Sequence, residues 1–214
     1  MNIAVIGHGN VGRTLGLGWA ARGHEVTFGV RDLGKSDVQD LLEAGQRVQA
    51  LPLRDAVAGA EIICLATPYP AALEFAAVSG DVSGKIVVDC TNPIGPGLVL
   101  TVGHESSGAE EIARSLPTAR VVKAFNSTGW ENMADSAYPG YGGLRPVMPV
   151  CGDDTDARQV VCRLSEDLGF EAWDWGPLAG ARYLEPLAML WIIPAYAQRK
   201  NCLNWLLINL AWER

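Results

Sequence analysis

Three glycines near the start of the chain have the spacing of a phosphate-binding turn. The segment Gly7-His8-Gly9-Asn10-Val11-Gly12 follows an apolar run at residues 3–6 and precedes an apolar-periodic stretch at residues 14–22. A GxGxxG pattern between a strand and a helix predicts dinucleotide binding, with the free N–H groups of the helix facing the phosphates. Gly7 permits the tight turn, Gly9 leaves room for a pyrophosphate, and Gly12 lets the helix pack closely on the sheet. A glycine-rich surface turn that binds nothing is the alternative.

The end of the next expected strand bears on which dinucleotide binds. Residues 24–28 form a β-favouring run that leads into Gly29-Val30-Arg31, with no acidic residue before Asp32. NAD-binding proteins of this architecture place an Asp or Glu there for the ribose 2′-hydroxyl. Arg31 could instead hold a 2′-phosphate with charge-assisted hydrogen bonds, and Lys35 and Ser36 lie just beyond it. We therefore predict NADP, with a solvated pair of Arg31 and Asp32 as the alternative.

Further polar candidates follow three later strands. Thr67-Pro68-Tyr69, Asn92-Pro93 and Asn126 each come directly after an apolar, β-favouring run. The carboxyl ends of parallel strands meet at one edge of an open sheet, where ligands bind. We therefore expect these residues to face the cofactor, although a purely structural turn explains the two prolines around Tyr69 almost as well.

These positions require a parallel sheet with helices on both faces. Three or more βα units joined by short connections are typical of a Rossmann-type, doubly wound α/β fold. A change to Tyr, Pro and Gly over residues 138–149 marks a boundary. We predict an NADP-binding Rossmann domain at residues 1–145 and a small C-terminal α+β lobe, ending in apolar helices, at 146–214. The expected strands are at residues 3–6, 24–28, 48–51, 61–66, 85–89, 120–125, 149–152 and 171–173, and the expected helices at 14–22, 37–43, 54–58, 107–116 and 154–168.

The bulk composition limits the classes of function. With 214 residues, 49% hydrophobic and 19% charged, the chain can bury a sizeable core. A net charge of −7 without a Lys or Arg cluster argues against a nucleic-acid partner. Since Met1 leads directly into the first strand, we expect no signal peptide. Pro194, Arg199 and Lys200 interrupt the apolar tail, so we expect no membrane span, which needs roughly 18–20 uninterrupted apolar residues.

The cysteines and histidines are too dispersed to form a disulfide framework or a metal site. We therefore predict no metal and a reduced, cytoplasmic protein. The apolar tail predicts a surface used in part for homodimerisation. The cysteines in question are Cys64, Cys90, Cys151, Cys162 and Cys202.

Several segments beyond the glycine turn carry a resemblance to a known family. They are Gly29-Val30-Arg31, Val121-Val122-Lys123-Ala124-Phe125-Asn126, Pro149-Val150-Cys151-Gly152-Asp153-Asp154, Gly176-Pro177-Leu178 and Arg182-Tyr183-Leu184-Glu185-Pro186-Leu187. With them the chain resembles the NADPH-dependent coenzyme F-420 (F420) reductases, or F420:NADP oxidoreductases, over most of its length. That family is related to the oxidoreductase domain of the STEAP-type metalloreductases. The resemblance implies hydride transfer between NADP and a flavin-like ring, a small C-terminal lobe, and dimers.

The resemblance also implies roles for individual residues. Arg31 would hold the 2′-phosphate, Asn10 and Val11 the pyrophosphate, and Asn126 would lie beside the nicotinamide. Hydride transfer between two stacked rings needs little acid–base chemistry from the protein. We therefore predict that Asn126, as the catalytic residue, orients a ring by hydrogen bonding and donates no proton. The predicted cofactor-binding residues are Gly7, His8, Gly9, Asn10, Val11, Gly12, Arg31, Lys35, Ala66, Thr67, Pro68, Tyr69, Asn92, Pro93 and Asn126.

The chain departs from the archaeal members of this family at three places. Those members carry Ser-Arg-Arg in place of Val30-Arg31-Asp32, His in place of Asn126, and another loop at residues 89–93. At the last two places the chain is more similar to the metalloreductase branch. We predict an NADP(H)-dependent oxidoreductase whose small-molecule acceptor is F420 or a flavin such as FMN or FAD. A reductase of a small carbonyl or imine, for which Lys123 could be a general acid or else a simple edge charge, and a non-catalytic NADP(H) sensor are the alternatives.

Overall fold

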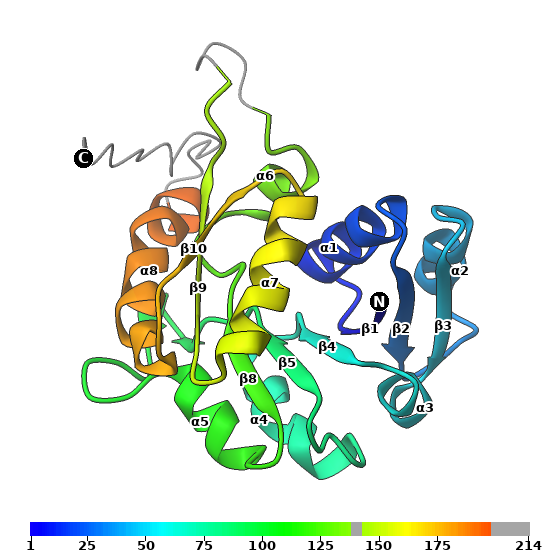
Figure 1. Ribbon diagram of the computed structural model, residues 1–214, viewed down its shortest axis with the longest axis horizontal. Helices are drawn as coiled ribbons and strands as arrows, with labels where there is room; N and C mark the ends of the chain where they lie inside the picture. Colours follow the sequence, from blue (N-terminus) through cyan, green and yellow to red (C-terminus); the bar gives the residue numbers. More distant parts are fainter. Residues whose placement is uncertain (138–142, 198–214) are drawn as a thin grey trace.

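The computed structural model describes residues 1–137 and 143–197, and its helices enclose an eight-stranded sheet (Figure 1). The strand order across the sheet is β10-β9-β8-β5-β4-β1-β2-β3. The strands are β1 (Asn2–Ile6), β2 (Glu25–Val30), β3 (Val48–Pro52), β4 (Ile62–Leu65), β5 (Ile86–Asp89), β8 (Arg120–Lys123), β9 (Val147–Gly152) and β10 (Glu171–Asp174).

Six neighbouring strands of the sheet, in the order β3-β2-β1-β4-β5-β8, are all parallel, and this is the strand order of a Rossmann fold. The apolar runs of the central strands β1, β4 and β5 are buried on both faces, as parallel strands covered by helices require. β9 then pairs antiparallel with β8, and β10 pairs parallel with β9. The predicted doubly wound α/β fold is confirmed. Because β9 continues the same sheet across residue 145, the division into two domains stays a prediction.

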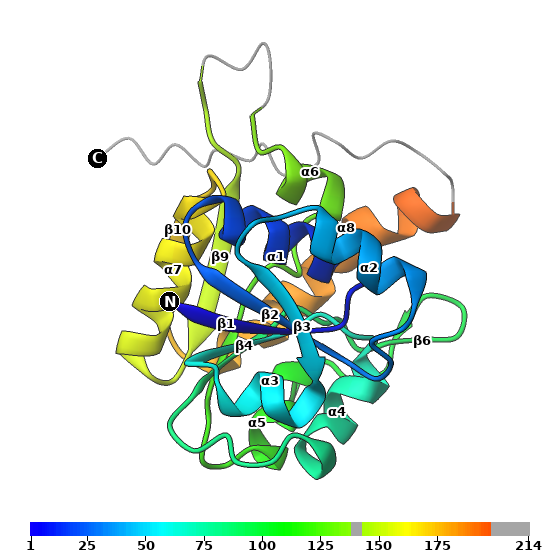
Figure 2. The same cartoon turned by 90° about the vertical axis from the view of Figure 1, so that its right-hand side faces the viewer.

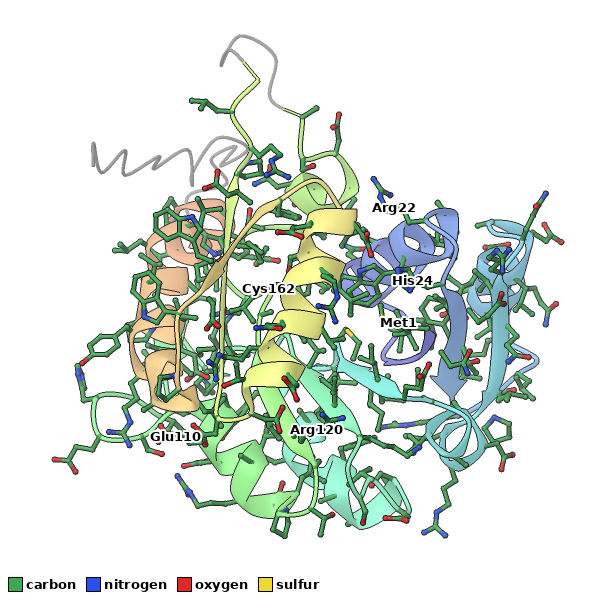
Figure 3. All side chains as sticks on the ribbon, viewed as in Figure 1. Met1, Arg22, His24, Glu110, Arg120 and Cys162 are labelled. Atoms are coloured by element: carbon green, nitrogen blue, oxygen red, sulfur yellow. The ribbon has the colours of Figure 1, made fainter. Side chains whose placement is uncertain are left out.

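Helices cover both faces of the sheet (Figure 2). One apolar core lies beneath α1, α2, α6 and α7, and a second lies beneath α3, α4, α5 and α8. His24, at 8% exposure, extends the first core toward α7, where its Nε2 lies 2.9 Å from Asp167 Oδ2 (Figure 3). The helices are α1 (Asn10–Ala21), α2 (Ser36–Glu43), α3 (Leu53–Ala58), α4 (Tyr69–Val78), α5 (Gly108–Ser115), α6 (Trp130–Ala134), α7 (Thr155–Asp167) and α8 (Ala181–Ala197), the last preceded by the 3-10 turn η1 (Leu178–Gly180).

Two predicted helix starts are confirmed by their caps. The Ser107 hydroxyl accepts a hydrogen bond from the Glu110 N–H at 3.2 Å, and the Asp154 carboxylate accepts one from the Ala157 N–H at 2.7 Å. Each cap satisfies an N–H group that has no partner within its helix.

Two helices and a two-stranded hairpin occupy segments for which no helix or strand was predicted. α4 begins at Tyr69 with Pro70 in its first turn, where the absent N–H of a proline costs no hydrogen bond. The helix α6 and a small antiparallel hairpin, β6 (Ile94–Gly95) with β7 (Val99–Leu100), are the others. The hairpin packs against α8 through apolar side chains. These short elements depend on tertiary contacts rather than on a periodic sequence pattern.

The last described helix, α8, contains Pro186 and Pro194. Among the residues that the structure describes, no helix combines the length and the apolar character needed to cross a bilayer. The second apolar stretch of the tail, from residue 203, and Cys202 lie outside the described residues.

Candidate functional site

The glycine turn between β1 and α1 leaves open space only in front of its middle glycine. Gly7 has φ of +100°, and a Cβ there would lie 2.5 Å from the Ala66 carbonyl oxygen. A Cβ on Gly12 would lie 1.9 Å from the Gly7 carbonyl oxygen, so the start of α1 packs directly on the turn. A Cβ on Gly9 would meet nothing within 4 Å. The backbone is therefore accessible at Gly9, where a pyrophosphate would approach.

Arg31 and Lys35 lie at the edge of this turn, beyond the end of β2. Both are exposed, and among the described residues neither forms an ion pair or a side-chain hydrogen bond. The alternative pair of Arg31 with Asp32 is absent from the ion pairs of the described residues, and one carboxylate oxygen of Asp32 accepts a hydrogen bond from the Gly34 N–H at 2.9 Å. His8, in the glycine turn, points toward α2, and its Nε2 lies 3.0 Å from Asp37 Oδ2 in the first turn of that helix. Two unpaired cations are thus available for an anionic group.

A cavity of about 690 Å³ opens beside the glycine turn, at the carboxyl ends of β4, β5 and β8. Its volume is within the range of roughly 300–1,000 Å³ typical of ligand pockets. Of the predicted cofactor residues, the cavity brings together Asn10, Val11, Thr67, Pro68, Tyr69, Asn92 and Asn126. The remaining ones, which do not line it, are Gly7, His8, Gly9, Gly12, Arg31, Lys35, Ala66 and Pro93.

The far wall of the cavity comes from residues that were not predicted. Trp130 on α6 and Trp191 and Tyr196 on α8 line it, together with Ile94 and Leu98 of the β6–β7 hairpin. Several aromatic side chains facing a cavity suit a planar ring. A periodic apolar pattern identified α8 but not this face of it, so the sequence carried no signal for these residues.

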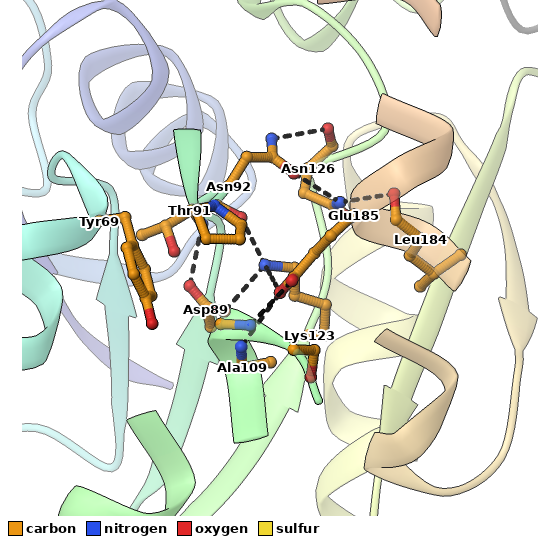
Figure 4. A network of polar contacts seen from close by, with 12 residues as sticks. Tyr69, Asp89, Thr91, Asn92, Ala109, Lys123, Asn126, Leu184 and Glu185 are labelled. Atoms are coloured by element: carbon orange, nitrogen blue, oxygen red, sulfur yellow. Dashed lines mark hydrogen bonds and ion pairs between the residues drawn. The ribbon is translucent and has the colours of Figure 1, made fainter. Parts of the chain in front are cut away.

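Asn126 is held in the cavity wall by a backbone turn and by two amide hydrogen bonds. Phe125 has φ of +60°, a left-handed conformation that is uncommon outside glycine and is found at functional sites. The Asn126 Nδ2 donates to Leu184 O and to Asn92 Oδ1, each at 3.1 Å (Figure 4). Since a backbone carbonyl only accepts, the contact with Leu184 fixes the orientation of the amide. Asn126 Oδ1 therefore remains as an acceptor without a donor among residues 1–137 and 143–197.

Several buried polar atoms around the cavity have no hydrogen-bond partner within the part of the chain that the structure describes. Leaving such an atom unpaired costs about 1–3 kcal/mol, so a group of them around one cavity points to a bound ligand. Four of these atoms are oxygens that can accept a hydrogen bond, and the fifth is a tryptophan indole nitrogen, whose N–H donates. The atoms are Thr67 Oγ1, Thr91 Oγ1, Asn126 Oδ1, Asn132 Oδ1 and Trp191 Nε1.

The Cys90 thiol and the Tyr69 phenol, which both line the cavity, are held protonated. Cys64 and Cys90 bring their sulfurs to 3.5 Å, and burial, followed by the contact with Cys64, raises the pKa of the Cys90 thiol. Burial, followed by a 2.6 Å hydrogen bond to Glu111 Oε2, raises the pKa of the Tyr69 hydroxyl. Protonated thiols are poor nucleophiles and poor metal ligands. In the part of the chain that the structure describes, no three His, Cys, Asp or Glu side chains gather as a metal site.

Lys123 is neither an edge charge nor a group that reaches the cavity. Its side chain is fully buried at the end of β8, between β5 and β9, and it does not line the cavity. Its ammonium donates to Asp89 Oδ2 at 2.9 Å, lies 3.1 Å from Glu185 Oε1, and donates to Thr91 O (Figure 4). An ammonium has three N–H groups, and all three are engaged.

Comparison with known proteins finds a matching family and two relatives that are reductases. The family described as NADP oxidoreductase coenzyme F420-dependent matches residues 2–93. The F420-dependent NADP reductase of Methanothermobacter thermautotrophicus is 32% identical over 208 residues, which are 90% of this chain and 88% of that protein. Metalloreductase STEAP3 of Rattus norvegicus is 30% identical over 200 residues, which are 90% of this chain and 38% of that longer protein.

Solved structures give the same result. A protein of Arthrobacter sp. FB24, provisionally described as an F420-dependent NADP reductase, has 32% identity and a TM-score of 0.84, covering 94% of this chain and 96% of that one. A reductive aminase of Aspergillus terreus in complex with NADPH and ethyl levulinate has a TM-score of 0.67 at 17% identity, covering 92% of this chain and 62% of that one. At that identity the likeness concerns the fold alone.

The fold, the glycine turn and these relatives define a Rossmann-type, NADP-dependent oxidoreductase. The chain belongs to the family of F420-dependent NADP reductases, as the resemblance of its sequence indicated.

Proposed function

We propose that the protein transfers hydride between NADPH and coenzyme F420 or a related flavin ring. The observation that carries this proposal is the single cavity that joins Asn10 and Thr67, beside the glycine turn, to the aromatic wall at Trp130 and Trp191. A nicotinamide entering from the first side and a planar acceptor against the second would meet within it. The family membership supports the same activity.

The residues around the cavity fit NADP in their chemistry. Arg31 and Lys35 offer free cations for the 2′-phosphate, and the open backbone at Gly9 offers N–H groups of the α1 start to the pyrophosphate. When bound, NADP supplies the hydride chemistry at its nicotinamide. The free Oδ1 of Asn126 can accept a hydrogen bond from an amide N–H and orient the ring. Trp191 can donate its indole N–H to a carbonyl oxygen of the acceptor.

Reduction of a carbonyl or imine would need a proton donor, and neither Lys123 nor Tyr69 is placed to act as one. Lys123 has no free N–H and lies outside the cavity lining. Tyr69 lines the cavity, but its hydroxyl donates to Glu111, away from a substrate. Reduction of a flavin-like ring by hydride also takes up one proton overall, but water can supply it, so no side chain of the protein is needed as a proton donor.

The test is to mix the purified protein with NADPH and, separately, with F420, FMN, FAD and a ferric chelate, and to follow the nicotinamide absorbance. Rapid oxidation of NADPH by F420 or a flavin is the expected result. Reduction of the ferric chelate alone would move the function to metal reduction. Tight NADPH binding without oxidation by any acceptor would contradict an enzymatic function and favour an NADP(H) sensor.

We also propose that α8 forms part of a homodimer interface. Several large apolar side chains of this helix are exposed, and such a surface on a small protein usually marks an interface. Sedimentation at low micromolar concentration should give a dimer, and a monomer would contradict the proposal. The side chains are Tyr183, Leu190, Ile193 and Tyr196.

A further inference from the structure

Beneath the cavity, three buried charged side chains tie two strands to two helices (Figure 4). Asp89 ends β5, Lys123 ends β8, and Glu185 lies on α8, with side-chain exposures of 0%, 0% and 1%. Glu185 also accepts hydrogen bonds from the Gly108 N–H at 2.8 Å and the Ala109 N–H at 3.0 Å, the first N–H groups of α5. The positive end of that helix offsets the second negative charge of the cluster.

This charged cluster is connected to polar groups of the cavity wall. Asp89 Oδ1 accepts a hydrogen bond from the Thr91 N–H at 2.9 Å, and Lys123 donates to the carbonyl of the same residue. The turn thus held places Asn92 next to the cavity. On the other side, Leu184 precedes Glu185 and its carbonyl accepts the hydrogen bond from Asn126 Nδ2. Asp89 and Lys123 therefore hold the turn that carries Asn92, and Glu185 follows the residue that binds Asn126. Both amide side chains line the cavity.

Lys123 keeps its positive charge despite burial. Burial disfavours the ammonium of Lys123, but the facing carboxylates of Asp89 and Glu185 outweigh it, and the net shift of the Lys123 pKa is upward. Buried ion pairs are weak evidence for stability, because removing ions from water costs about as much as their attraction returns. A geometric role is therefore the better explanation for three charges in this place.

We propose that Asp89, Lys123 and Glu185 are positioning residues for hydride transfer, which hold Asn92 and Asn126 at the geometry the two rings require. The inference rests on the proposed function and adds to it the source of the site's rigidity. A displacement of about 1 Å in a reacting pair can cost up to about 100-fold in rate. A small shift of α8 against β8 would be transmitted to Asn126 through Leu184.

The test compares Glu185→Gln with the control Glu110→Gln. Glu110 also links α5 to α8, through hydrogen bonds of 2.9 and 2.7 Å from Arg182, but it contacts neither Lys123 nor the cavity wall. Both variants remove one carboxylate charge between the same two helices. The measurements are the melting temperature, the Kd for NADPH, the single-turnover rate of hydride transfer to the acceptor, and the isotope effect with NADPH deuterated at the nicotinamide C4.

For Glu185→Gln we expect the single-turnover rate to fall by roughly 10- to 100-fold, with an increased isotope effect and a change in Kd below about threefold. Glu110→Gln should keep the wild-type rate. Equal rates for the two variants would overturn the positioning role. If Glu185→Gln does not fold, Asp89→Asn serves with the same expectation, and failure of both to fold assigns the cluster to folding and overturns the proposal. A wild-type protein that reduces no acceptor would instead refute the proposed function itself.

Discussion

The accessible backbone at Gly9 leads to a prediction that separates ligand binding from folding. Gly9 is the N-cap of α1 with φ of −69°, a conformation open to any residue, and a Cβ there meets nothing within 4 Å. In Gly9→Ala, the reduced entropy of the unfolded chain stabilises by about 0.4–1 kcal/mol, while alanine is a poorer N-cap by about 0.5 kcal/mol. The two effects nearly cancel, so we expect an unchanged free energy of unfolding.

Binding should respond very differently to the same methyl group. It would project into the space proposed for the pyrophosphate and disturb a charge-assisted hydrogen bond worth about 1.5–3 kcal/mol. Since about 1.4 kcal/mol is a factor of ten, the Kd for NADPH should rise roughly 10- to 100-fold. Calorimetric titration with NADPH and urea denaturation measure the two quantities on the same sample.

The control for this experiment is Gly12→Ala. Its Cβ would lie 1.9 Å from the Gly7 carbonyl oxygen, so α1 must move away from the turn. Overpacking of this kind costs about 1–3 kcal/mol, and stability and affinity should fall together. If Gly9→Ala binds NADPH within twofold of the wild type, the pyrophosphate does not lie over Gly9 and the proposed placement of the cofactor is refuted.

Three further predictions concern charges at or near the site. Arg31→Ala removes an exposed, unpaired cation, so the free energy of unfolding should stay within about 0.5 kcal/mol while the Kd rises for NADPH far more than for NADH; equal losses would overturn the 2′-phosphate assignment. Asn126→Asp places a carboxylate against the Leu184 carbonyl, which raises the pKa of the new acid in the folded state. The unfolding free energy should therefore fall as pH rises from about 4 through that raised pKa, by roughly 2–4 kcal/mol, and equal values in urea titrations at low and high pH would contradict this. The hydrogen bond from Arg182 lowers the pKa of Glu110, so that its stabilising contribution is present above the usual carboxyl pKa and is lost as pH falls through the lowered value. Arg182→Ala should return this pKa toward its ordinary range in a carbon-13 NMR titration, and an unchanged value would assign the shift to another contact.

The local patterns of the sequence were sufficient to predict the fold class and about half of the residues of the candidate site. The run before Gly7, the glycine spacing and the helix after it are consecutive in the chain, and the buried strands each carry their own apolar signature. The prediction that Asn92 and Asn126 lie together followed from the general rule that parallel strands end at one edge, and the structure places them in hydrogen-bond contact. The helix caps at Ser107 and Asp154 could also be predicted from local sequence, since a cap joins residues that are three positions apart.

The other half of the site was decided by contacts between distant residues. Lys123 reads as an ordinary charge within a strand, and only the pairing of β8 with β5 and the packing of α8 place Asp89 and Glu185 around it. The aromatic wall likewise arises because α6 and α8 line the same cavity, although Trp130 and Trp191 are sixty-one positions apart in the chain. The sequence by itself determined a dinucleotide-binding fold, because the backbone geometry of the glycine turn is set by neighbouring residues, and it favoured NADP through Arg31 at the end of the second strand. Tertiary packing decided which side chains surround the cavity and which charged side chains lie buried near it, because burial and pairing depend on residues that the local pattern does not contain.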